Sequence, residues 1–313
     1  MGKTELVLGQ EVVSELTPFF DAAAANDNRR FRQINTLCAA SLAMEAEAAK
    51  EAGMLGFMAR AMVQATMPHS RVDGNEFTRT NGAYTLSMLA PSRIGLPYGS
   101  IPRLLIGYLT TEAVQHKSRE IILGASLSRF MSELGLTATG GRWGSIPRLR
   151  DQMTRLMACS ISCTWEDEHA LALENINIAD SANLWWKPQA PEQAALWEST
   201  VTLSEKFYRE CNENPIPIDL RALKALKRSP MALDIYVWLA YRMSFLKGNT
   251  SIPWAALQMQ FGADYPATPQ GRRDFKKKFL QALAKVHLVY PEARLEPDTY
   301  HLILKPSRLH ISR

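Results

Sequence analysis

Residues 99–104 read Gly-Ser-Ile-Pro-Arg-Leu, and the same six residues return at 144–149. Ser100 and Ser145 can each cap a helix, and proline is tolerated in a first turn because its missing N–H has no partner there. The two copies therefore predict two helices, one reaching about Val114 and one reaching about Ala158. Nothing around the copies repeats, so we interpret them as shared helix-start chemistry and not as a solenoid period.

The residues around the two copies predict the rest of a compact unit. The elements expected are a strand at 84–90, an apolar run at 121–123, a helix at 126–134, and strands at 160–165 and 170–178. Gly135 ends the middle helix, and the last two strands alternate apolar and polar side chains. Helix, helix, turn, helix and a two-stranded ribbon is the order of a winged-helix domain.

The same order returns in the last third of the chain. Asp219, Ser251 and Thr268 each precede helix-forming residues, so we expect them to cap helices. The elements expected are a strand at 201–203, helices ending near Cys211 and spanning 220–227, 230–245, 252–261 and 268–287, and a hairpin of 288–294 with 299–304. The sequence therefore predicts an α+β fold, mainly helical, with two tandem winged-helix domains.

A helical segment is expected to precede these domains. Residues 37–67 are rich in Ala, Met, Glu and Leu, which favours a long helix or a helical pair closed by Pro68. We predict a helical, partly flexible N-terminal extension at 1–83, a first winged-helix domain at 84–190 and a second at 196–313. Residues 191–198 are the expected linker.

The composition excludes several classes of protein. Of 313 residues, 46% are hydrophobic and 21% charged, with 17 Gly and 17 Pro, which is typical of a folded chain. No apolar stretch approaches the roughly 18–20 residues of a membrane span, and Glu5 and Glu11 interrupt any signal peptide. Four cysteines are too few to stabilise a chain of this length by disulfide bonds, so we expect reduced thiols in the cytoplasm.

Charge is distributed unevenly along the chain. The net charge is +5, but residues 1–83 sum to −2, residues 84–195 to 0 and residues 196–313 to +7. This asymmetry is expected when one domain faces an acidic partner such as DNA, although a solvated basic surface gives the same sum.

Residues 270–287 have the two faces that a DNA-recognition helix requires. At about 100° per residue, the apolar side holds Phe275, Phe279, Ala282, Leu283 and Val286. The residues expected to face bases are Gln270, Arg273, Lys277, Gln281 and the small Ala284, with Arg272, Lys276 and Lys278 placed toward phosphates. Arg and Lys can bond guanine and Gln suits adenine, whereas the alternative is a solvated charged helix.

The corresponding helix of the first unit fits DNA less well. Leu149, Met153 and Leu156 mark its core side, but Asp151 lies on the opposite face, where a carboxylate would repel phosphates. We therefore assign the first unit mainly to partner or dimer contacts. Arg142, Arg148 and Arg150 are its candidate phosphate contacts.

No pattern in the chain predicts catalysis. Residues 139–145 lack the Gly-Lys-Ser/Thr end of a phosphate loop, and Cys159 and Cys163 have no second pair of metal ligands, so core thiols are the expectation. No His-x-His pair could hold a metal beside a nicking tyrosine. We therefore expect no catalytic residue, no metal and no cofactor.

Several motifs of the first unit resemble plasmid-encoded RepA-type replication initiators. They are residues 96–104, Thr110-Thr111-Glu112-Ala113, Arg119-Glu120-Ile121, Leu123-Gly124, Gly140-Gly141-Arg142 and the helix at 148–156, within a similarity that covers about 84–310. The resemblance implies theta replication and binding to repeated origin sequences (iterons). It also implies melting of an AT-rich segment and recruitment of host DnaA and the replicative helicase, without enzyme activity. In related two-winged-helix initiators the first domain makes a homodimer, and the second binds DNA in a monomeric form.

Two other functions remain open from the sequence. A transcriptional repressor, including one that represses its own gene, would need the same winged helices. A DNA-processing enzyme would need a metal or tyrosine constellation, which the sequence does not show.

Overall fold

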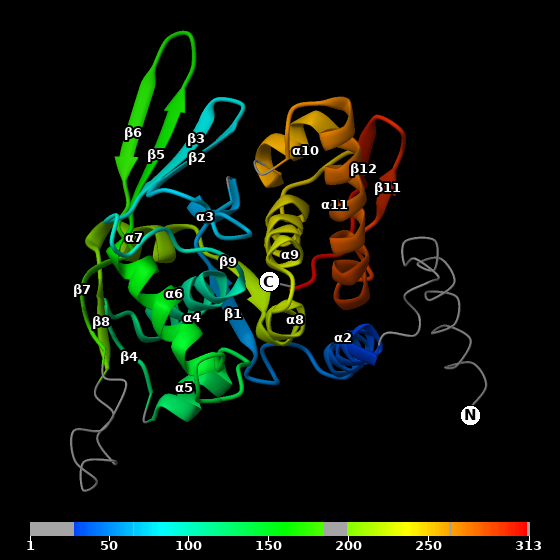
Figure 1. Ribbon diagram of the computed structural model, residues 1–313. Helices are drawn as coiled ribbons and strands as arrows, with labels where there is room; N and C mark the ends of the chain where they lie inside the picture. The colour runs from blue at the N-terminus through cyan, green and yellow to red at the C-terminus, as the bar shows by residue number, and fades with distance from the viewer. Residues whose placement is uncertain (1–27, 65, 125, 185–198, 263–264, 312–313) are drawn as a thin grey trace, which may run out of the picture.

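A computed structural model describes residues 28–64, 66–124, 126–184, 199–262 and 265–311. The chain is a mixed α/β protein in which two groups of helices lie on either side of a short antiparallel strand pair (Figure 1). The pair joins β1 (Leu55–Met58) to β9 (Ile216–Asp219), and Leu55 lies opposite Asp219. Its register brings an N-terminal segment into contact with the last third of the chain. The expected linker at 191–198 lies outside the described residues.

The helices of the first unit follow the predicted order. The elements are α4 (Ser100–His116), β4 (Glu120–Ile122), α5 (Leu127–Glu133), α6 (Ser145–Ala158), β5 (Ser160–Glu166) and β6 (Leu171–Asn175). Both copies of the hexapeptide begin helices, as predicted. The expectation that their serines are the caps is wrong, because Gly99 and Gly144 hold the N-cap positions and neither makes a side-chain cap bond.

An arginine at the same position of each hexapeptide stabilises the start of its helix. Arg103 Nη1 donates to the Gly99 carbonyl at 2.7 Å, and Arg148 Nε donates to the Gly144 carbonyl at 3.3 Å. In each copy the arginine thus satisfies the carbonyl of the N-cap glycine four residues earlier. The shared hexapeptide is therefore a shared local structure.

The strands of the first unit belong to two sheets. One has the order β2-β3-β5-β6 and includes β2 (Glu76–Asn81) and β3 (Tyr84–Leu89). The other has the order β4-β8-β7 and includes β7 (Ala179–Asn183) and β8 (Thr200–Leu203). The β5–β6 ribbon projects beyond the helices at the upper left of Figure 1. It extends the β2–β3 hairpin and does not pair with β4.

The helices of the second unit follow the predicted order, but the strand predicted at 201–203 forms as β8 and pairs with β4 and β7 of the first unit. The elements are α7 (Glu205–Glu213), α8 (Leu220–Leu226), α9 (Pro230–Met243), β10 (Thr250–Pro253), α10 (Trp254–Phe261), α11 (Pro269–Val289), β11 (Leu295–Pro297) and β12 (His301–Leu304). The last three strands form one sheet with the order β10-β12-β11. Asp219 and Thr268 cap α8 and α11 as predicted, with side chains that accept from Arg221 N and Gly271 N.

Two predictions in this unit are wrong. Ser251 caps no helix, because it lies in β10 and pairs with Ile303, and Pro253 takes the N-cap position of α10. The hairpin is shorter than expected, because Leu288 and Val289 are buried and continue the apolar side of α11.

The segment before the first unit is not wholly helical, which corrects the prediction for 37–67. Helix α2 (Asn28–Ala46) is followed by a turn in which Gly53 has φ +65°, then by β1, the single turn α3 (Ala61–Gln64) and β2. Pairing of β1 with β9 and of β2 with β3 overrides the local helix propensity. Helix α2 packs against α8 and α11 of the second unit, and β1 packs against α4 of the first, so this segment joins both units.

The buried apolar side chains form one continuous cluster across both units. All four cysteines are free, as predicted, and Cys159, Cys163 and Cys211 are buried in this cluster. No helix in the described part of the chain has the length and apolar character of a membrane span.

Candidate nucleic-acid interface

The apolar side of α11 is buried as predicted. Phe275, Phe279 and Val286 are completely inaccessible, and Ala282 and Leu283 are nearly so. Phe279 makes edge contacts with Trp254 and Phe261, whose ring centroids lie 5.9 and 5.4 Å away. This packing fixes which side of the helix faces outward.

The outward side of α11 is basic over its first three turns. Gln270, Arg272, Arg273, Lys277 and Lys278 are exposed. Gln270 Nε2 donates to Asp274 Oδ1 at 2.9 Å, and Arg273 Nε donates to Gln270 Oε1 at 3.2 Å. The network holds the amide of Gln270 and the guanidinium of Arg273 side by side on the exposed side of the helix.

Lys276 has an intramolecular role that the sequence did not indicate. Its Nζ donates to the carbonyls of Asp298 at 2.6 Å and Thr299 at 3.2 Å, and it lies 4.8 Å from the ring centroid of Trp254. These carbonyls belong to the turn between β11 and β12. Lys276 therefore fastens the ribbon turn to the helix, whereas it was expected to face phosphates.

The C-terminal half of α11 is not available to a ligand. Ala284 is only 4% exposed and Gln281 is half-buried, and α2 packs against this helix. The expectation that Ala284 lets DNA approach closely is therefore wrong. The outward basic surface is confined to residues 270–278, which we call the α11 front.

The first unit presents a second basic surface at the start of α6. Arg142, Arg148 and Arg150 are exposed. Asp151 lies beside them, but its carboxylate is 2.9 Å from Arg155 Nε, one helical turn away. Because this pair neutralises Asp151, the carboxylate opposes an anionic ligand less than the sequence indicated. Residues 136–158 hold four arginines and this one acid.

The loop before α6 is tightly constructed. Thr139 N donates to Ser145 Oγ at 2.9 Å, and Ser145 N donates to Thr139 Oγ1 at 2.9 Å. A side chain at Gly144 would clash with the Thr139 carbonyl, and Gly141 has a φ of +78°. The Gly-Gly-Arg-Trp-Gly-Ser motif at 140–145 therefore closes a compact turn, and Arg142 and Trp143 lie at its tip.

The β5–β6 ribbon of the first unit is acidic. Residues 160–175 include Glu166, Asp167, Glu168 and Glu174 and contain no Lys or Arg. Leu171 and Leu173 are 64% and 57% exposed on β6, the edge strand of its sheet. This ribbon is therefore unsuited to phosphates and better suited to a protein.

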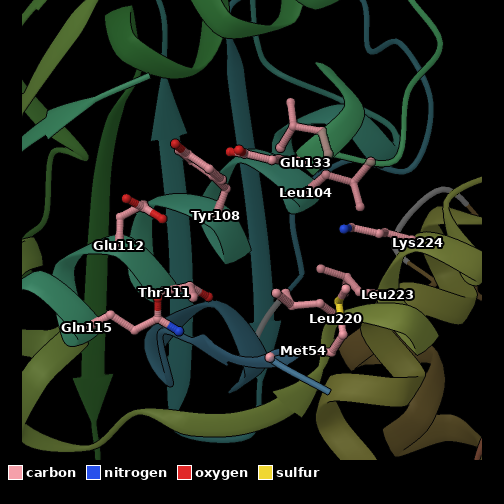
Figure 2. A pocket seen from close by; sticks show the side chains of 12 residues that line it. Met54, Leu104, Tyr108, Thr111, Glu112, Gln115, Glu133, Leu220, Leu223 and Lys224 are labelled. Carbon is pink, nitrogen blue, oxygen red and sulfur yellow. The ribbon is translucent and has the colours of Figure 1, made fainter. Parts of the chain in front are cut away.

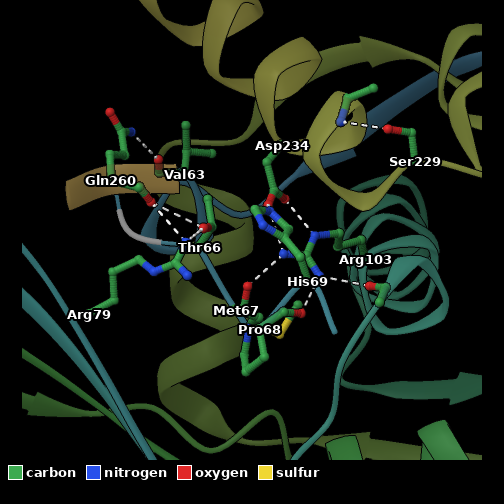
Figure 3. A network of polar contacts seen from close by, with 12 residues as sticks. Val63, Thr66, Met67, Pro68, His69, Arg79, Arg103, Ser229, Asp234 and Gln260 are labelled. Carbon is green, nitrogen blue, oxygen red and sulfur yellow. Dashed lines mark hydrogen bonds and ion pairs between the residues drawn. The ribbon is translucent and has the colours of Figure 1, made fainter. Parts of the chain in front are cut away.

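A buried ion-pair network joins the two units, and it was not predicted from the sequence. Arg103 of α4 is 3% exposed and binds Asp234 of α9 through Nε–Oδ1 at 2.6 Å and Nη2–Oδ2 at 2.7 Å (Figure 3). His69 Nε2 lies 2.7 Å from Asp234 Oδ2. Arg103 also donates to the carbonyls of Met67 and Pro68. A lone carboxylate within the apolar sequence 231–239 was the signal that a buried partner had to exist.

Protonation in this network follows from its geometry. The Arg103 guanidinium and the bond from His69 hold the pKa of Asp234 below its usual value, although burial opposes them. Burial lowers the pKa of His69 and outweighs the bond to Asp234. We therefore assign an ionised Asp234 and a neutral His69 whose Nε2–H donates to the carboxylate.

A second polar cluster reinforces the same junction. Arg79 of β2 is fully buried and donates from Nη1 to the Gln260 carbonyl at 3.1 Å and to Thr66 Oγ1. Gln260 Nε2 donates to the Val63 carbonyl at 2.9 Å. Both clusters appear in Figure 3. Together with the β1–β9 pair they hold the two units as one body.

A cavity of about 240 Å³ also lies between the units. Its walls come from α4, α8 and the end of α5, with Leu104, Leu220 and Leu223 as the apolar floor (Figure 2). Glu112, Glu133 and Lys224 supply the charges, and burial raises the pKa of Glu112 and lowers that of Lys224. In the described part of the chain, no three His, Cys, Asp or Glu side chains gather as metal ligands would.

Comparison with known proteins gives both sequence and structural matches. A family model described as plasmid-encoded RepA protein matches residues 96–255, just over half of the chain. A crystal structure of domains 2 and 3 of RctB aligns with a TM-score of 0.51 and 12% identity, over 77% of this chain and 94% of that one. A second structure of RctB domains 2–3, residues 155–483, aligns with a TM-score of 0.48 and 11% identity, over 78% and 96%. No curated protein sequence gives a significant match.

Proposed function

Because the chain belongs to the family of plasmid-encoded RepA proteins, we propose that it is a plasmid replication initiator that binds repeated origin sequences in double-stranded DNA. The observation that carries the proposal is the α11 front. Its exposed Arg273 and Gln270 are positioned by each other and by the buried phenylalanines behind them. Arg to guanine and Gln to adenine are common base contacts in the major groove.

The strand order supports a winged-helix fold for the DNA-binding domain. In this proposal residues 196–313 form that domain, α11 enters the major groove and the β11–β12 turn lies beside it. Lys276 sets the distance between helix and turn. Residues 84–190 form a related domain with the same helix order and a divided sheet, to which β8 (Thr200–Leu203) adds one strand.

The first domain is the proposed dimerisation module. Leu171 and Leu173 are exposed on the free edge of β6, and an unpaired edge strand can pair across a two-fold axis. A homodimer would use this edge, and the DNA-binding form would be the monomer. Sedimentation of the full chain tests this: Leu173→Lys should lower the dimer fraction, and an unchanged distribution would contradict it.

The proposed initiator opens DNA by binding, without catalysis or a cofactor. Several copies on adjacent repeats would bend the DNA, at a deformation energy of about 1–6 kcal/mol per site, and strain a neighbouring AT-rich tract. Host DnaA and the replicative helicase would then act on the opened strands in the bacterial cytoplasm.

Two assays test the proposal. Fluorescence anisotropy at fixed salt should show tighter binding to a duplex of the repeats beside the gene than to a shuffled duplex, and equal binding would contradict it. Permanganate footprinting of a supercoiled origin plasmid with purified protein and DnaA should then show reactive thymines. Specific binding without such reactivity would favour a transcriptional repressor, and strand scission by the protein alone would favour a DNA-processing enzyme.

A further inference from the structure

We propose that the loop around Trp143 binds unpaired bases of opened DNA by stacking a base on the exposed indole. The proposal rests on the proposed function and adds a second DNA site, on the first unit. Trp143 is 82% exposed, the largest exposed fraction among the large apolar side chains of the described residues.

Trp143 is exposed because hydrogen bonds within the loop close the turn and leave this residue at its tip. The reciprocal bonds of Thr139 and Ser145 close the turn, and Gly144 has no space for a side chain. Ser145 Oγ also donates to the Thr137 carbonyl. The loop therefore fixes the backbone that directs the indole outward, which suits a stacking platform because little backbone freedom is lost on binding.

The charges beside the indole suit a nucleic acid backbone. The Arg142 guanidinium lies 5.1 Å from the centroid of the Trp143 ring, so a cation already covers part of the ring. Arg148 is held against the loop through the Gly144 carbonyl, and Arg150 is exposed on the same helix. A stacked base would place its flanking phosphates among these guanidinium groups.

The geometry favours single-stranded DNA over a duplex or a protein. In a duplex both faces of each base are covered by neighbouring bases, so an indole can stack only after the strands separate. Contacts to duplex phosphates would need the arginines but not the tryptophan. A protein partner would have to be acidic, because residues 136–158 hold four arginines and their one acid is paired with Arg155. Opened origin DNA supplies both the charge and the free base faces.

The test compares binding of the full chain to labelled oligothymidylate and to the origin-repeat duplex. Trp143→Ala should weaken binding to oligothymidylate roughly 5- to 150-fold, the range for loss of one base–aromatic stack, and leave duplex binding unchanged. Trp143→Phe should retain most of the single-strand affinity. Trp165→Ala is the matched control, because Trp165 is also exposed but lies on the acidic ribbon.

Each other outcome overturns the inference. Unchanged binding of oligothymidylate by Trp143→Ala, or equal losses on single strand and duplex, would exclude stacking of unpaired bases. If only the capture of DnaA by the immobilised protein were lost, the loop would be a protein contact. Failure of the wild-type chain to bind single strands while it binds the duplex would remove this inference alone, whereas failure on the duplex would remove the proposed function. Equal thermal denaturation midpoints would show that the variants are folded.

Discussion

The two copies of Gly-Ser-Ile-Pro-Arg-Leu have the same local structure and opposite surroundings. In both, the arginine donates to the carbonyl of the N-cap glycine. Arg103 then turns into the protein and pairs with Asp234, while Arg148 remains exposed beside Trp143. The hexapeptide determines where a helix begins, and the element packed against that helix determines what its arginine does.

The buried and the exposed copy of the hexapeptide also differ in what they contact. The first copy belongs to the junction that fixes the units to each other, and the second belongs to a surface that a ligand can reach. A family resemblance within such a motif therefore identifies the helix start, but it does not assign the arginine to DNA. Substitution of the arginines one at a time tests this distinction.

The largest expected effect is on stability, at the first copy. Arg103→Met removes one partner of a buried ion pair, so the free energy of unfolding should fall by about 3–5 kcal/mol. Arg148→Met, the matched change at the exposed copy, should stay within about 0.5 kcal/mol of wild type. Urea denaturation of the full chain, followed by circular dichroism, measures both.

A double variant separates the lost charge pair from lost packing. Arg103→Met combined with Asp234→Leu leaves no unpaired buried charge and should recover much of the stability. If Arg103→Met cost no more than Arg148→Met, the two copies would not differ in the way the structure indicates.

The next effect concerns DNA and a third arginine, on the α11 front. Arg273→Ala should cost roughly 1–3 kcal/mol in binding to the preferred repeat and relax base preference at one position. Arg148→Ala, away from α11, should leave base preference unchanged. Anisotropy with single-base variants of the repeat measures the difference. Unchanged affinity and preference in Arg273→Ala would exclude α11 as the recognition helix.

A smaller effect separates two neighbouring lysines. Lys278 is exposed, so Lys278→Ala should weaken all duplex sequences alike and reduce the slope of log affinity against log salt by about 1. Lys276→Ala should release the β11–β12 turn, so amide hydrogen exchange at Thr299 and Tyr300 should become faster. Faster exchange in Lys278→Ala instead would reverse these roles.

The smallest effect is the response of the junction to acid. The folded-state pKa of His69 lies below its ordinary 6.5, so the unfolded chain takes up the proton first and stability falls as the pH drops below that value. The pKa of Asp234 is also lowered, so its contribution is lost at still lower pH, as the carboxylate becomes protonated. His69→Gln should flatten the decline between pH 6.5 and 5 by less than about 1.4 kcal/mol per pH unit. A parallel decline in wild type and His69→Gln would show that folding does not lower the pKa of His69.

The sequence predicts those parts of the molecule that depend on local chemistry. Helices α4, α6, α9 and α11 follow from a proline near each start and from apolar periodicity, and the buried side of α11 was predicted residue by residue. Strand β1 was missed because its partner β9 is distant in sequence, and an Ala- and Met-rich segment favours a helix until that partner is present.

The sequence predicted the exposed basic residues of the candidate site, but it did not predict how far along α11 the exposed surface extends. Periodicity placed Gln270, Arg273 and Lys277 on the outer side of α11, but it could not show that Ala284 is buried. It could not show that Lys276 reaches the ribbon turn, since the turn lies more than twenty residues along the chain. Nor could it foresee Trp143 at the tip of a closed loop, because the bonds of Thr139 and Ser145 exist only in three dimensions.

The pairing of β1 with β9 has a consequence for how the protein is made. On a ribosome that adds about 5–20 residues per second, Leu55 emerges roughly ten to thirty seconds before its partner Asp219. Throughout that interval the edge of β1 and the surface that α2 offers to α8 and α11 stay uncovered. The first half of the chain is therefore a natural client for chaperones during translation, and a message cut short before β9 yields a product that cannot complete its own fold.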